Sequence, residues 1–205
     1  MKTKNIVVLT VLLSGLIGGS WFFLRDRSSS LSARPGKTEA DSFTEKITEL
    51  ANSEKSGTPK KVEFRESEVD AYLQHEISPL FPKGLKQLDV KLGQDSISAK
   101  SLIDFDAIET SDGAKNPLMS ALFHGEHNLD VVTTIKTQNG TGTYQVSHVL
   151  LDQKEIPKPL VDLLIRKYVI PKYPAANPDS PFELPYNIKK VDLLPGKAIV
   201  HQNTP

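Results

Sequence analysis

The sequence predicts an α+β domain in which a mainly antiparallel sheet packs on helices, preceded by a transmembrane helix. The transmembrane helix is predicted from an uncharged apolar run at Ile6–Leu24. Farther along the chain, apolar residues recur either with the helical period or with the alternation of a strand. A short turn joins the two members of each predicted strand pair, which is typical of antiparallel pairing.

Residues 1–24 are predicted to be a membrane anchor or a signal segment. The apolar run matches the roughly 20 residues that a helix needs to cross a bilayer core. Lys2 and Lys4 precede the run, and Trp21 begins an aromatic cluster at its end, as interfacial aromatic residues do. A buried core helix is the weaker interpretation, because the run has no polar face.

Two membrane interpretations stay open. The run is either an uncleaved anchor or a signal peptide cleaved before Trp21, after the small residues Gly18 and Ser20. We favour the anchor, because cleavage would leave an aromatic cluster exposed to water at the new N-terminus. The short basic tail favours export of the remaining chain, although the positive charges within residues 25–37 favour the opposite orientation. We therefore expect a single-pass membrane protein whose domain is extracytoplasmic, either periplasmic or at the cell surface.

Residues 25–37 are predicted to be a flexible spacer, because they are rich in Ser and end near a Pro-Gly pair. The soluble α+β domain is then expected at residues 38–205. Its first helix is predicted over residues 40–55, where Phe43, Ile47 and Leu50 share one face.

The next predicted elements are a strand with Val62 and Phe64, and a helix at Glu66–Ile77. Acidic residues crowd the first turns of this helix, where the helix dipole favours them. Alternating apolar residues on both sides of residues 93–95 then predict a hairpin.

A short helix is predicted at Asn116–Phe123, followed by long strands at Glu126–Gln138 and Thr141–Leu151 around an Asn-Gly turn. An apolar helix at residues 158–170 is expected to be largely buried. A proline-rich surface loop over residues 172–185 and a last hairpin around Pro195-Gly196 complete the chain.

Charge and composition exclude several classes of function. The chain has 25 basic and 25 acidic residues, so its formal net charge is zero and nothing favours nucleic-acid binding. It has no cysteine, which excludes disulfides and thiolate metal sites. It has no nucleophile elbow and no phosphate-binding glycine loop. We therefore predict no catalytic residue, no cofactor, no metal and no enzymatic activity.

Two clusters of polar residues are candidate sites. His124 and His127 flank Glu126, but the break at Gly125 would not preorganise them for a metal, so surface histidines are the favoured interpretation. Asp104 and Asp106 would share one face if they lay on a strand, as paired carboxylates or Ca²⁺ ligands do. A solvated sheet face is the favoured interpretation of that pair.

Three parts of the chain share a family pattern. VEFRESEVDAYL at Val62–Leu73 is a strand followed by a helix with an early Glu, and LDVKLGQDSISAKSLIDFD at Leu88–Asp106 is strand, turn, strand. The third part joins VLLDQKEIPKPLVDLLI at Val149–Ile165 to FELPYNIKKVDLLPGKAIV at Phe182–Val200. Together they resemble membrane-anchored extracytoplasmic bacterial relatives of the tubular lipid-binding (TULIP-like) and AsmA-like domains.

This resemblance implies a curved antiparallel sheet around a long helix, with an apolar groove for acyl chains and no active site. The residues expected to line such a groove come from the two long strands and the apolar helix, which could instead be the main core helix. The expected groove residues are Leu129, Val131, Tyr144, Val146, Leu160, Leu164 and Tyr168.

The expected function is a membrane-tethered, extracytoplasmic, non-enzymatic domain that binds a lipid or another apolar envelope ligand. The alternative is a structural or scaffolding partner of a membrane or envelope protein complex, which would carry an exposed apolar patch. A hydrolase acting on envelope polymers is the third hypothesis, and the sequence lacks the cluster of catalytic residues that it would need.

Overall fold

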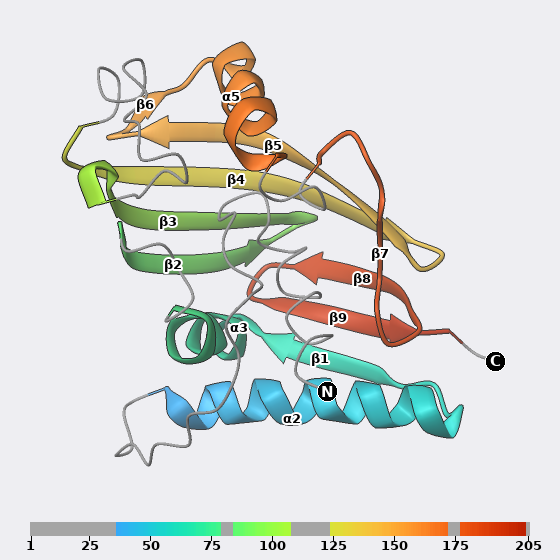
Figure 1. The fold of residues 1–205 in the computed structure, drawn as a ribbon. Coiled ribbons are helices and arrows are strands. Elements are labelled where there is room, and N and C mark those ends of the chain that lie inside the picture. The colour runs from blue at the N-terminus through green and yellow to red at the C-terminus, as the bar shows by residue number, and fades with distance from the viewer. Residues whose placement is uncertain (1–35, 79–83, 108–123, 172–176, 204–205) are drawn as a thin grey trace.

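The protein is described here from a computed structural model, over residues 36–78, 84–107, 124–171 and 177–203 (Figure 1). In this part of the chain, helices pack against two antiparallel sheets. The predicted α+β class with mainly antiparallel strands is therefore confirmed, although the strands form two sheets. The predicted anchor and most of the spacer lie outside the described residues, as does the predicted helix at Asn116–Phe123. No helix among the described residues is long and apolar enough to cross a membrane.

Helix α2 (Lys37–Ser56) confirms the first predicted helix. Phe43, Ile47 and Leu50 are buried along one face, as their spacing predicts. The helix ends at Gly57, whose φ of 67° is left-handed and whose N–H donates to the carbonyl of Ser53.

The smaller sheet has the strand order β1-β9-β8, with β1 at Lys61–Arg65, β8 at Ile188–Leu194 and β9 at Lys197–Gln202. Strands β8 and β9 form the predicted last hairpin, and β1 joins them from far away in the sequence. Figure 1 shows α2 running beside β1. The ring of Phe43 on α2 lies 5.0 Å from that of Phe64 on β1 and 4.4 Å from that of Tyr72. These aromatic contacts join the helix to the sheet.

The predicted helix after β1 is present as α3 (Glu66–Tyr72), which continues as a π-helical turn, η1 (Leu73–Ile77). Its acidic residues do more than interact with the helix dipole. Glu66 accepts a hydrogen bond from the N–H of Leu92 at 2.8 Å, and Asp70 accepts one from the N–H of Val90 at 3.1 Å. Helix α3 therefore caps an edge of the larger sheet with carboxylates.

The larger sheet has the order β2-β3-β4-β5-β6, with β7 also paired to β5. The two long strands, β4 and β5, meet at a turn in which Asn139 and Gly140 both have positive φ, as the Asn-Gly pair predicts. The bounds of the strands are Leu85–Gly93 for β2, Ser96–Asp104 for β3, Glu126–Gln138 for β4, Thr141–Leu151 for β5, Lys154–Glu155 for β6 and Phe182–Glu183 for β7.

The two sheets meet where the β4–β5 hairpin reaches β8. The N–H of Gly140 donates to the carbonyl of Lys189 at 2.9 Å. The hydroxyl of Thr137 accepts from the N–H of Val191 and donates to its carbonyl. The outer edge of β8 is thus held by the tip of the larger sheet.

Strand β5 contains a bulge that changes its pattern of burial. Val132 of β4 pairs with His148, and Thr133 pairs with Val146, so Ser147 is the extra residue. Tyr144 and Val146 are buried as expected. The bulge shifts the alternation, so Val149 is buried on the far side of the bulge, whereas Leu150 is half-buried.

The apolar helix is present as α5 (Lys158–Leu164) followed by a π-helical turn, η4 (Ile165–Val169). The prediction that it is largely buried was wrong. Val161 and Ile165 are buried, but 51% of Leu163 is exposed. The helix lies beside β5 at the end of the larger sheet (Figure 1), so only one side of it packs on the sheet.

The proline-rich segment is described from Asn177 onward. It was predicted to be a surface loop, but part of it forms a strand. Its residues Phe182 and Glu183 form β7, and Phe182 is buried against β5. Gly142 makes this contact possible, because a Cβ atom at that position would overlap the ring of Phe182.

Candidate functional site

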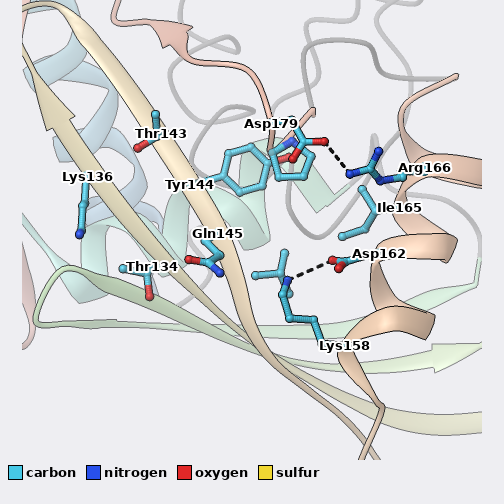
Figure 2. Close-up of a pocket in the computed structure, with 12 residues that line it drawn as sticks. Thr134, Lys136, Thr143, Tyr144, Gln145, Lys158, Asp162, Ile165, Arg166 and Asp179 are labelled. Carbon is cyan, nitrogen blue, oxygen red and sulfur yellow. Dashed lines mark hydrogen bonds and ion pairs between the residues drawn. The ribbon is translucent and has the colours of Figure 1, made fainter.

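The candidate site is a cavity of about 520 Å³ between β4–β5 and the helix α5–η4 (Figure 2). The segment just before β7 borders it at Pro178 and Asp179. A volume of this size lies within the range of small-molecule and peptide-anchor pockets, roughly 300–1,000 Å³.

The floor of the cavity is the outer edge of β5. The consecutive residues Thr143, Tyr144, Gln145 and Val146 all line it. Successive side chains of a strand point to opposite faces, so a cavity that touches all four must border the edge of the strand. Lys136 of β4, which pairs in register with Thr143, lines the same floor from the neighbouring strand.

The wall of the cavity carries two ion pairs. Lys158 contacts Asp162 at 3.1 Å one helical turn along α5, and Arg166 contacts Asp179 at 2.8 Å. The second pair joins η4 to the segment before β7, as the dashed line in Figure 2 shows. The buried side chain of Ile165 lies between these pairs on the same wall.

Tyr144 is the buried aromatic residue of the floor. Burial raises the pKa of its phenol to about 12, and the nearby carboxylate of Asp179 adds to the rise. The phenol is therefore neutral at physiological pH and can donate a hydrogen bond, but it does not act as a base.

The predicted groove residues fall into separate places. Tyr144 and Val146 line the cavity. Val131 is buried and Leu129 half-buried on β4, where both pack in the core away from the cavity. Neither residue lines the cavity, which forms at the edge of the sheet.

On the helix, Leu160 and Leu164 are half-buried and do not line the cavity, which is lined by the next residue, Ile165. The side chain of Tyr168 lies outside the described part of the structure. Sequence reasoning missed the charged wall, whose only local signal is the i, i+4 spacing of Lys158 and Asp162.

The two histidines of the HGEH segment bind separate carboxylates. Nδ1 of His124 lies 2.6 Å from Asp106, and Nδ1 of His127 lies 2.6 Å from Asp152. The hydrogen bond with Asp152 and a second one with the carbonyl of His124 raise the pKa of His127. In the described ranges, no three histidine or acidic side chains gather as a metal site.

Asp104 and Asp106 do not form the paired-carboxylate geometry, which was the less favoured interpretation, and only Asp104 lies on the sheet. Strand β3 ends at Asp104, and residues Phe105–Ala107 form a 3₁₀ turn, η3, so the two side chains do not share a strand face. Asp104 forms an ion pair with Lys86 at 3.3 Å, whereas Asp106 accepts from the N–H of Gly125. Both carboxylates therefore have structural partners.

A second cavity lies inside the apolar core between α2, α3 and the two sheets. Its volume is about 40 Å³, and its lining, which includes Phe43, Phe64 and Leu193, is apolar. This volume is far below that of a ligand pocket and leaves no room for an acyl chain.

No protein-family model matches this chain, no curated protein matches its sequence, and no solved structure matches it. The resemblance to TULIP-like and AsmA-like domains therefore stays a prediction.

Proposed function

We propose that this protein is a membrane-tethered, extracytoplasmic, non-enzymatic binding domain whose ligand occupies the cavity between β5 and α5. The observation that carries the proposal is the cavity itself, which combines apolar side chains, Val146 on the floor and Ile165 on the wall, with charged side chains. Such a mixed lining suits a ligand with apolar and polar parts.

Tethering rests on the sequence of Ile6–Leu24, with the domain outside the cytoplasm. A spacer of about a dozen residues would hold the cavity within a few tens of ångströms of the bilayer. A lipid or another envelope component would therefore be present at high local concentration.

The test is ligand binding by the full-length protein purified in mild detergent. Lipid mass spectrometry should detect a bound amphipathic molecule, and a fluorescent acyl probe should bind. Thr143→Trp, which adds bulk to the cavity floor, should weaken probe binding at least about tenfold, whereas Leu163→Trp on the exposed side of α5 should leave it unchanged. Absence of copurified lipid together with absence of probe binding would exclude the lipid ligand.

A scaffolding role is the second candidate. It is supported by the exposed Leu163, with half-buried Leu160 and Leu164 nearby on the same helix. On native gels of solubilised membranes, a large complex that Leu163→Glu dissociates would favour this role. Migration as a monomer would count against it.

A further inference from the structure

The outer edge of β5 is paired at its two ends. Near its start, Thr141 and Gly142 pair with β7, and near its end, Leu150 and Leu151 pair with β6. In the described part of the chain, no strand pairs with Gln145 to His148 on this side. The cavity described above lies against this stretch.

The direction of the backbone groups follows from the flanking hydrogen bonds. The carbonyl of Gly140 accepts from the N–H of Leu184 on the β7 side, so Val146, an even number of residues later, directs its N–H and carbonyl to the same side. The carbonyl of Val149 accepts from Ile156 on that side too. The bulge at Ser147 accounts for the odd spacing between Val146 and Val149.

Other sheet edges in the structure are capped by side chains. Carboxylates of α3 bind the N–H groups of Val90 and Leu92 on β2, and the hydroxyl of Thr137 binds Val191 on β8. On β1, the ammonium of Lys46 donates to the carbonyl of Glu63 at 2.7 Å. At Val146 no described side chain takes this role, and a cavity is present instead.

We propose that an extended peptide segment of a partner protein adds as a short strand to β5 within this cavity, opposite Gln145–His148. This inference rests on the proposed function and names its ligand class. The segment would span about 14 Å at roughly 3.4 Å per residue, with β7 and β6 as its neighbours at either end. Backbone hydrogen bonds would supply affinity, and the walls of the cavity would select side chains.

The chemistry of the segment follows from the two sides of the edge. Alternate side chains would lie beside Val146 and Ile165, where apolar residues fit. The intervening side chains would lie beside Gln145, on the face of the sheet that also carries Lys136. Lys136 has no ion-pair partner among the described residues, unlike Lys158 and Arg166, so an acidic side chain is expected there. The segment should therefore alternate apolar and polar residues and carry an acid.

The experiment uses the full-length protein in nanodiscs and a displayed library of seven-residue peptides with alternating apolar and polar positions. Selected peptides should be enriched in Asp or Glu. N-methylation of the alternate amides that face β5 should weaken their binding at least about tenfold, because it removes backbone hydrogen bonds and keeps the side chains. Lys136→Glu should weaken acidic peptides and strengthen their Lys-substituted versions. Lys91→Glu, on exposed surface of β2, should change neither.

Failure to select any binder, or equal binding of the N-methylated peptides, would overturn the inference. If a fluorescent acyl probe binds in the cavity and no peptide does, the inference fails and the proposed function stands. If neither binds, both fail. A dimer in light scattering that Val146→Pro converts to a monomer would assign the edge to a second copy of the chain and would also overturn the inference.

Discussion

The larger sheet ends in two different edges. On the outer edge of β2, Glu66 and Asp70 of α3 accept hydrogen bonds from Leu92 and Val90, and the carbonyl of Leu92 accepts one from Gly196 at 3.0 Å. The outer edge of β5 is paired by two-residue strands at its ends, with a cavity of about 520 Å³ between them.

The β2 edge is thus blocked by other described parts of the chain, whereas the middle of the β5 edge is not. The free N–H and C=O groups of an unpaired strand edge can pair with another chain. Proteins usually block such an edge with charged side chains, a helix or a bulge. The β2 edge is blocked by a helix that carries its own acceptors. Among the described residues the β5 edge has no such block between β7 and β6, and a pocket lies beside it, which is the arrangement expected of a binding site.

The largest expected effect comes from Glu68, which joins α3 to α2. Its carboxylate is fully buried and accepts hydrogen bonds from Lys46, Ser42 and the N–H of Arg65. Glu68→Ala should lower the free energy of unfolding by about 2–3 kcal/mol, because the half-buried side chains of Lys46 and Ser42 lose a charged acceptor. Urea denaturation measures this. Glu63→Ala, whose ion pair with Lys197 is half-exposed, should cost less than about 1 kcal/mol.

Glu68 also predicts how stability depends on pH. Burial raises the pKa of its carboxyl, but hydrogen bonds from Lys46, Arg65 and Ser42 outweigh burial and bring the pKa down to about 2. A carboxyl with a depressed pKa stabilises the fold above its unfolded pKa of about 4.3, and this stabilisation is lost as pH falls toward the folded value. Unfolding free energy should therefore decrease between about pH 4.5 and pH 2. An equally steep decrease in Glu68→Gln would contradict this assignment.

A smaller effect is expected at Asp70, which caps Val90 directly. Asp70→Ala should cost about 1–2 kcal/mol and speed amide exchange at Val90, because the N–H loses its acceptor. Asp70→Asn keeps an acceptor oxygen and should retain most of the protection. Equal exchange at Val90 in both variants would show that the carboxylate does not cap the edge.

Gly142→Ala should act on the other edge. The added methyl group would overlap the ring of Phe182, so β7 should separate from β5 at a cost of about 1 kcal/mol. Proteolysis in the segment before β7 should then be faster, and Thr143→Ala provides the matched control. Unchanged protease resistance would mean that the ring can rearrange without releasing β7.

The smallest effect on stability is expected at the pair of His127 on β4 and Asp152 in the β5–β6 turn. The hydrogen bond with Asp152 raises the pKa of His127. The stabilisation from this pair is therefore full below the ordinary pKa of histidine, and it is lost as pH rises through the pKa of His127 in the folded protein. Asp152→Asn should shift the NMR titration of His127 to lower pH. A titration that does not move would contradict the pairing.

Most helices and strands could be predicted, because each depends on the spacing of residues that are close together in the sequence. Phe43, Ile47 and Leu50 mark α2 by their spacing, and Asn139-Gly140 fixes the turn between the two long strands. The pairing of β1 with β9 could not be predicted, because Val62 and Val200 are far apart in the sequence and no local signal joins them.

The site was predicted less well than the fold. The apolar residues Tyr144 and Val146 could be placed on one strand face, but the cavity depends on a helix standing beside an edge. That position depends on tertiary contacts such as the ion pair of Arg166 with Asp179, which no local pattern predicts. The hydrophobicity of α5 predicted burial, and its location at the end of the sheet leaves Leu163 exposed.

The two edges should differ in backbone protection, which amide hydrogen exchange of the full-length protein measures residue by residue. We expect slow exchange at Val90 and Leu92, whose N–H groups bind carboxylates, and fast exchange at Val146. A selected peptide should slow exchange at Val146 and leave Val90 unchanged. Protection of Val146 equal to that of Val90 in the protein without peptide would show that the two edges do not differ.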